Sequence, residues 1–156
     1  ILQADESWLL DGRLPTVAFR MNRQSKNAQH IVESLEGHPR IQKIHYPKLF
    51  TDPEQQRIRD SQCRYSGALF SLELMDGKSG AFNFLRSLKL IRNAVSLGGV
   101  ESLACHPATT THSEMSAEDL RLAGVTDNLV RLSIGVEDWR DLLRDILQAL
   151  EGGLYG

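Results

Sequence analysis

Apolar residues recur every three or four positions after Pro15, which is the spacing of one face of an α-helix. They are Ala18, Met21, Ala28, Ile31, Val32 and Leu35. Pro15 suits the first turn of a helix and Gly37 suits its end, so the pattern predicts an amphipathic helix of about six turns. The preceding DESWLL reads as the end of a short helix that Gly12 and Pro15 break.

Alternation of apolar and polar residues predicts two half-buried strands. In residues 66–74, the side chains expected to share one face are Ala68, Phe70, Leu72 and Leu74. In residues 128–136, one face is expected to carry Val130, Leu132 and Ile134, and the other Leu129, Arg131 and Ser133. Residues 41–46 predict a shorter strand, and residues 88–95 an extended apolar segment.

Capping residues and helical spacing predict four further helices. Asp52 caps the first, with Pro53 at its first position, and a second contains Ala81, Phe82, Leu85 and Leu88. Ser116 opens the third through an S-x-x-D arrangement, and Asp138 caps the last, whose apolar residues are Leu142, Leu143, Ile146, Leu147 and Leu150.

About five helices therefore alternate with about four strands. The crossover connections between the predicted strands are too irregular for a purely parallel, doubly wound sheet. We expect an α+β, two-layer fold, with a mixed or mostly antiparallel sheet and helices on one face. Residues 94–116, AVSLGGVESLACHPATTTHSEMS, predict a long irregular segment, and the final GGLYG is expected to fray.

Composition narrows the class of protein. The 156 residues are 41% hydrophobic and 24% charged, with a net charge of −2, which fits one soluble globular domain and no nucleic-acid partner. No apolar run approaches the roughly 20 residues that a bilayer requires, so no membrane association is expected. The start at Ile1 has no signal-peptide pattern and looks cut from a longer chain. Cys63 and Cys105 lack metal or redox spacing, which favours free thiols in a reducing cytoplasm.

Arg131 is an anomaly in its strand, because apolar residues surround it on both sides. A guanidinium keeps its charge and is costly to bury alone, so it requires an anion or a polar setting. One interpretation is structural: an ion pair with Glu101 or Glu137, or an edge position facing solvent. The functional interpretation is a clamp for a ligand carboxylate.

The segment from Ser96 to Ser113 is rich in glycine and hydroxyl groups, which suits either a binding loop or a structural turn. Its Cys105, His106 and His112 raise two further hypotheses, a metal site and a catalytic thiol. No carboxylate completes a familiar ligand spacing, so no metal site is predicted. A thiol nucleophile oriented by His112 lacks a third group.

Two stretches carry a family resemblance. SLGGVESLACHPATTTHS and AGVTDNLVRLSIGVEDWRDLLRDILQAL closely resemble the C-terminal region of the Cys/Met-metabolism enzymes that use pyridoxal 5′-phosphate. That family includes cystathionine γ-synthase, cystathionine lyases, methionine γ-lyase and O-acetylhomoserine sulfhydrylase. SWLLDGRLPTVAFRMNRQSKNA and HPRIQKIHYPKL extend the resemblance over nearly the whole chain.

The resemblance implies the small C-terminal domain of a fold-type I enzyme. Residues 1–37 would form the N-terminal segment and long connecting helix, and residues 38–156 the domain itself. The cofactor-binding large domain, with the lysine that holds the cofactor as a Schiff base, would precede Ile1. No catalytic residue, no certain cofactor ligand and no bound cofactor are therefore expected in this chain alone. Full-length members would be cytoplasmic homodimers or homotetramers.

The resemblance also assigns a substrate site. Arg131 matches the arginine that holds the substrate α-carboxylate, and Ser96 with Leu97 matches the segment that approaches it. Thr111 and Val95 match pocket positions. An apolar Val95 weakly favours C–S lysis of a methionine- or cysteine-type substrate over chemistry on cystathionine. In DGRLPT, Pro15 stands where the family carries a lysine.

Three functions remain open. The first is a lyase or synthase that eliminates or replaces a β- or γ-substituent of a sulfur amino acid. The second is a non-catalytic amino-acid-binding or assembly module that needs a lysine-bearing partner. The third is a thiol or metal hydrolase around Cys105 and His112.

Overall fold

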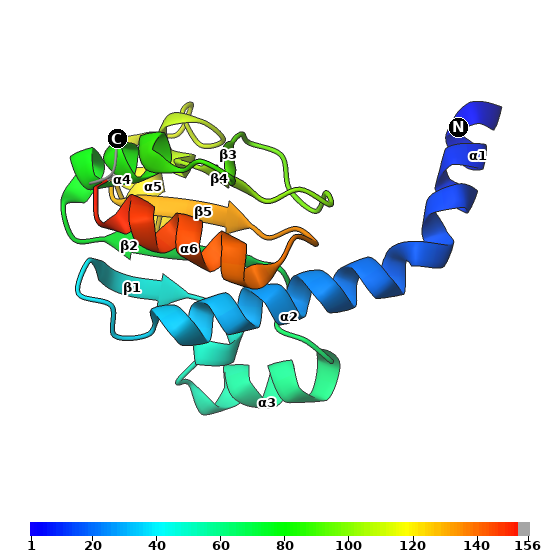
Figure 1. The fold of residues 1–156 in the computed structure, drawn as a ribbon, viewed down its shortest axis with the longest axis horizontal. Coiled ribbons are helices and arrows are strands. Elements are labelled where there is room, and N and C mark those ends of the chain that lie inside the picture. Colours follow the sequence, from blue (N-terminus) through cyan, green and yellow to red (C-terminus); the bar gives the residue numbers. More distant parts are fainter. Residues whose placement is uncertain (153–156) are drawn as a thin grey trace.

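One five-stranded sheet organises the chain. A computed structural model describes residues 1–152, and the sheet has the strand order β1-β2-β5-β4-β3 (Figure 1). The strands are β1 Ile41–His45, β2 Leu69–Leu74, β3 Arg92–Asn93, β4 Leu103–Cys105 and β5 Leu129–Ser133. Only β3 and β4 pair in parallel, and the other neighbours are antiparallel. The sheet is thus mixed and mostly antiparallel, which confirms the α+β prediction.

The hydrophobic core lies between one face of this sheet and three helices. They are α2 Val17–Leu35, α4 Gly77–Ser87 and α6 Trp139–Leu150. The predicted alternation holds in β2, whose core residues Phe70, Leu72 and Leu74 are nearly inaccessible. The prediction of a half-buried strand is wrong for β5, because Leu129 and Ser133 are buried on one face as Val130 and Leu132 are on the other. Figure 1 shows α2 and α6 side by side across this face. The opposite face carries Leu129, Arg131 and Ser133.

The remaining helices are short and stand outside that layer. They are α3 Pro53–Gln62, α5 Ala117–Leu122, and the 3₁₀ turns η2 Pro47–Leu49 and η3 Pro107–Thr109. Three predicted caps are confirmed: the side chains of Asp52, Ser116 and Asp138 accept backbone hydrogen bonds at the starts of α3, α5 and α6. These carboxylate and hydroxyl oxygens satisfy amides that the helix itself leaves free.

The N-terminal residues form an arm that projects from the body (Figure 1). It contains α1 Ala4–Arg13, the 3₁₀ turn η1 Leu14–Thr16 and the first turns of α2, and neither α1 nor η1 has a buried residue. The predicted break at Gly12 is wrong, because Gly12 lies inside α1. The other half of that prediction is confirmed: the chain turns at Pro15, whose ring restricts the backbone and lacks an N–H. The arm exposes Trp8, Leu14 and Phe19 among other apolar side chains.

Two predictions for the middle of the chain need correction. Residues 94–116 are not wholly irregular, since β4 runs buried through the sheet between β5 and β3. Residues 88–95 form only the two-residue β3, because the amides of Lys89, Leu90 and Ile91 donate to the Asp145 carboxylate on α6 at 2.8, 2.9 and 2.8 Å. The predicted fraying of GGLYG falls mainly on residues 153–156, outside the described residues.

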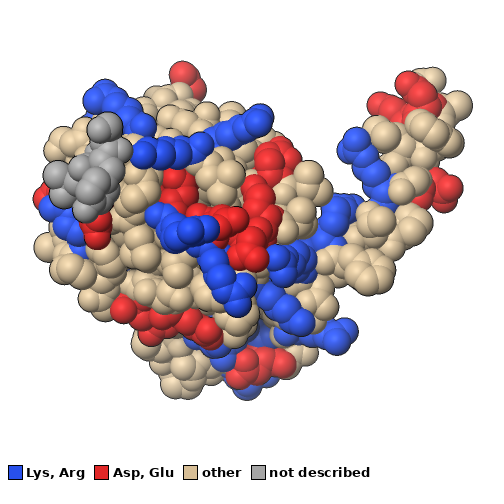
Figure 2. Space-filling model, in the orientation of Figure 1, with Lys and Arg blue, Asp and Glu red and all other residues tan. Residues whose placement is uncertain are grey.

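No helix within residues 1–152 combines the length and apolar character that crossing a membrane would need. On the face in Figure 2, acidic and basic side chains lie in neighbouring patches, and neither sign covers the face.

Candidate carboxylate-binding site

Arg131 lies in the centre of the sheet, on the face away from the helical core. Its neighbours in register are Ser71 of β2 and Cys105 of β4. Its Nη2 donates to the backbone carbonyls of Val95 and Ser96, at 2.7 and 3.1 Å. The guanidinium is therefore held against the loop between β3 and β4 instead of extending freely into water.

The guanidinium has no carboxylate partner among the described residues. The Glu137 carboxylate, one of the two partners considered from the sequence, is occupied: it accepts from the Ser102 amide and hydroxyl at 2.7 and 2.9 Å. The Nε of Arg131 is buried and has no hydrogen-bond partner. A buried, charged donor without an acceptor is costly, and a carboxylate is the acceptor that best fits the planar guanidinium.

The loop that holds Arg131 is fixed by polar contacts. The Gly98 amide donates to Ser133 Oγ at 3.0 Å, and Ser133 lies two residues after Arg131 on the same face of β5. The Gly135 amide donates to Ser102 Oγ at 2.8 Å, and the Val136 amide to the Val100 carbonyl at 2.8 Å. These bonds join the loop to the end of β5, so Val95 and Ser96 have a defined position beside Arg131.

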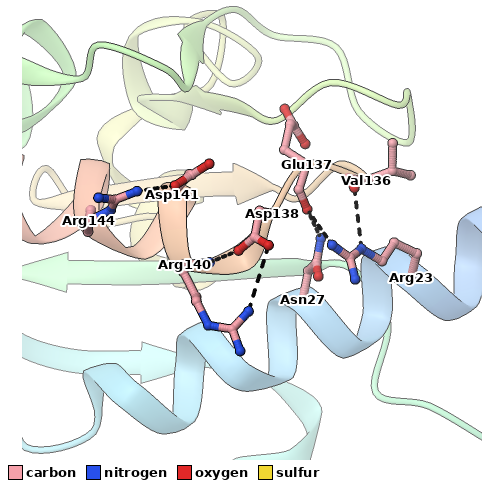
Figure 3. A network of polar contacts seen from close by, with 8 residues as sticks. All are labelled: Arg23, Asn27, Val136, Glu137, Asp138, Arg140, Asp141 and Arg144. Carbon is pink, nitrogen blue, oxygen red and sulfur yellow. Dashed lines mark hydrogen bonds and ion pairs between the residues drawn. The ribbon is translucent and has the colours of Figure 1, made fainter.

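The long helix fixes the other side of the turn after β5. Figure 3 shows Arg23 and Asn27 of α2 directed at the backbone of residues 136 and 137. Asn27 Nδ2 donates to the carbonyls of Gly135 and Glu137 at 3.1 and 2.8 Å, and Arg23 donates to those of Val136 and Glu137 at 3.4 and 3.3 Å. Helix α2 therefore supports the same turn that supports the loop.

The predicted site residues are only partly brought together. Val95 and Ser96 contact Arg131 through their carbonyls, and the residues Val95 and Leu97 are each 52% exposed. Thr111 Oγ1 lies 2.8 Å from His112 Nδ1, and no hydrogen bond of the described residues joins Thr111 to Arg131. The sequence analysis did not predict that Ser133 binds the loop. Its position two residues after Arg131, on the same face of the strand, was the signal that could have indicated it.

Two surface depressions border this loop. One, of about 480 Å³, includes Ser96, Arg92 and Glu101 in its lining. The other, of about 390 Å³, is largely apolar and lies between α2 and the loop, with Leu97 and Gln24 among its lining residues. The loop thus separates a charged depression from an apolar one.

The cysteine and histidine residues of residues 105–112 have structural surroundings. Cys105 is fully buried in β4. His106 is also buried, with Nε2 2.9 Å from the Asp127 carbonyl and Nδ1 2.8 Å from Thr109 Oγ1, so both ring nitrogens have partners. Within residues 1–152 no three His, Cys, Asp or Glu side chains are grouped to hold a metal ion. The geometry offers no support for a thiol or metal hydrolase.

The chain is similar to known proteins over nearly its whole length. The L-methionine gamma-lyase of Fusobacterium nucleatum subsp. nucleatum is 42% identical over 151 residues, which are 97% of this chain and 38% of that enzyme. A solved structure of cystathionine gamma lyase from Micromonospora echinospora superposes with a TM-score of 0.90 at 35% identity, over 98% of this chain and 40% of that one.

A third relative carries the cofactor. A structure from Campylobacter jejuni, assigned as an O-acetylhomoserine (thiol)-lyase, contains N′-pyridoxyl-lysine-5′-monophosphate at its position 205. It matches with a TM-score of 0.87 and 35% identity, over 94% of this chain and 35% of that one. The present chain therefore spans about two fifths of the length of its relatives.

The family model described as Cys/Met metabolism PLP-dependent enzyme matches residues 1–151. Sequence, fold and family model agree, and the chain belongs to this family of pyridoxal-phosphate-dependent enzymes of Cys/Met metabolism, in which the relatives named above are lyases.

Proposed function

We propose that this chain is the substrate-side, C-terminal part of an enzyme that eliminates or replaces the β- or γ-substituent of a sulfur amino acid. In this proposal Arg131 binds the α-carboxylate of the substrate. The observation that carries it is the buried Arg131 Nε, which lacks a partner while Nη2 is held by two backbone carbonyls. A planar carboxylate can accept from the remaining donors and is thereby oriented.

The residues present fit the acid end of an amino acid and do not fit the cofactor's aldehyde. The buried side-chain N and O atoms without partners in residues 1–152 are the Arg131 Nε and the Gln24 Oε1, and neither is an amine that could bond to an aldehyde. None of the five lysines of the chain lies in the Ser/Thr-rich setting that the family resemblance requires of the Schiff-base lysine. We infer that the cofactor is anchored by polypeptide outside this chain. When bound, pyridoxal phosphate supplies the electron sink for chemistry at the substrate's α-carbon.

The substrate preference is proposed from Val95. Its side chain is half exposed beside the carbonyl that holds Arg131, and it offers an apolar surface with no charge for a distal ammonium group. This favours a thioether or thiol substrate, as in a methionine γ-lyase. The similarity to an L-methionine gamma-lyase over 97% of the chain supports the same choice.

The remaining expectations are part of the proposal. The complete enzyme acts in the cytoplasm as a homodimer or homotetramer, and the chain alone neither binds the cofactor nor turns over substrate. Leu97 and Ser96 border the carboxylate, and Thr111 reaches the substrate pocket when the rest of the enzyme is in place. The domain division at residue 37 stays a prediction.

The test uses the full-length polypeptide that contains this chain, loaded with pyridoxal phosphate. Methionine and one water should yield methanethiol, a four-carbon 2-keto acid and ammonia. Arg131→Lys keeps the charge but loses the planar fork, so KM should rise about 10- to 100-fold, as expected for the loss of a charge-assisted hydrogen bond. Arg144→Lys is the matched control, because Arg144 is an exposed arginine on α6 paired with Asp141.

Unchanged kinetics of Arg131→Lys would overturn the carboxylate assignment. Absence of turnover with every sulfur amino acid tested would instead favour the non-catalytic amino-acid-binding or assembly module.

A further inference from the structure

Gln24 is a fully buried polar residue in the middle of α2. Only 1% of it is exposed, and its Nε2 donates to the Gly99 carbonyl at 2.5 Å. Its Oε1 is buried without a hydrogen-bond partner among residues 1–152. An orphaned buried oxygen costs free energy, so stability alone would favour an apolar side chain at this position. What the Gln24 amide provides, and an apolar side chain would not, is the hydrogen bond to the Gly99 carbonyl.

Gly99 belongs to the loop that holds Arg131. The preceding Gly98 is fixed by Ser133 Oγ and has a φ of +76°, a conformation that suits glycine. Gln24 of α2 and Ser133 of β5 thus hold two consecutive loop residues. Three and four residues upstream of Gly99, the carbonyls of Ser96 and Val95 orient the guanidinium.

We propose that Gln24 is a positioning residue for the Arg131 site, and this rests on the proposed function. By holding the Gly99 carbonyl, its amide fixes the loop so that the Val95 and Ser96 carbonyls engage Nη2 and leave Nε directed to a ligand carboxylate. Glu137 and Ser102 also support the loop, but they satisfy backbone amides on both sides of it. Among the described residues, the one hydrogen bond of the Gln24 side chain goes to the loop.

The consequence is a link between the long helix and ligand binding. Helix α2 continues from the projecting arm into the body, and Gln24 is the residue through which it hydrogen-bonds to the loop. A change at Gln24 should therefore affect ligands that have a carboxylate, and not those that lack one.

The experiment compares two probes on the cofactor-loaded, full-length protein by calorimetry. Norleucine has a carboxylate and no sulfur leaving group, and pentylamine is the same molecule without the carboxylate. Gln24→Met keeps the length of the side chain and removes its donor. The dissociation constant of norleucine should rise about tenfold, as for the loss of one hydrogen bond, and that of pentylamine by less than about twofold.

Gln29→Met on the same helix is the control, because the Gln29 amide donates only to Glu33 on the helix surface. Equal changes for both probes, or none for either, would overturn the positioning role of Gln24. Where Gln24→Met does not fold, Gln24→Leu carries the same comparison, since it also removes the donor and leaves an apolar side chain in this buried position.

Arg131→Lys is measured alongside to separate the two proposals. If Arg131→Lys discriminates between the probes and the Gln24 variants do not, only the positioning role fails. If Arg131→Lys does not discriminate either, the proposed function itself fails.

Discussion

Gly135 lies at a backbone position in the site where no side chain fits. A Cβ built there would stand 2.2 Å from the Val100 carbonyl oxygen and 2.3 Å from a Glu137 carboxylate oxygen. The turn after β5 and the loop that holds Arg131 pass each other at this point, joined by the Gly135–Ser102 and Val136–Val100 hydrogen bonds. The close approach of two backbones is what requires glycine here.

Gly135→Ala should therefore destabilise the protein by about 2–4 kcal/mol, because rigid backbone cannot move away from the new methyl group. Urea unfolding of this chain measures the change. Gly12→Ala is the control: no atom lies within 4 Å of its Cβ position, and alanine in α1 should be neutral or stabilising by up to about 1 kcal/mol. Equal unfolding midpoints for Gly135→Ala and the unaltered chain would contradict the close approach.

Single residues of the site differ in how far the sequence predicts them. Arg131 stands out because a permanent charge interrupts an apolar strand. Gln24 does not stand out, because its partner Gly99 is 75 residues away and a glutamine on a helix usually faces solvent. Its burial follows only from the way α2 lies on the sheet.

Elements were predictable where local chemistry determines them. The caps at Asp52, Ser116 and Asp138 and the alternation in β2 depend on neighbouring residues. Strand β4 was missed because its three residues, Leu103–Cys105, are too few to show a period. They are extended because β5 pairs with them, which is a tertiary effect.

Asp145 connects α6 to the segment before β3. The residue is 6% exposed, and its carboxylate accepts from three successive amides, at residues 89–91. Asp145→Asn replaces an acceptor oxygen by a donor, so we expect a loss of about 1.5–3 kcal/mol in unfolding free energy. Asp141→Asn on the same helix, an exposed partner of Arg144, should change it by less than about 0.5 kcal/mol. Urea unfolding compares the two, and equal losses would argue against the role of Asp145.

At the scale of the whole molecule, the chain exposes more surface than its size requires. Its accessible area is 9739 Å², whereas a compact protein of this mass exposes roughly 7,900 Å². The projecting arm, with exposed Trp8 and Phe19, accounts for part of this excess. Because the chain spans about two fifths of its relatives, an apolar arm of this kind is consistent with a surface that packs against further polypeptide.

Removal of residues 1–16 should leave the body intact, because no residue of α1 or η1 is buried. The free energy of unfolding of the body should change by less than about 0.5 kcal/mol. Sedimentation should show weaker self-association than for the whole chain. A large loss of stability on truncation would mean that the arm packs on the body in solution.

The central claim is that the guanidinium of Arg131, fixed by the Val95 and Ser96 carbonyls, binds the carboxylate of an amino acid. The most direct measurement is a crystal structure of the full-length, cofactor-loaded protein with norleucine bound. We predict a norleucine carboxylate oxygen about 2.7–2.9 Å from Arg131 Nε, the usual length of a charge-assisted hydrogen bond. A carboxylate bound to another cation, with Arg131 contacting only the loop carbonyls, would contradict the account.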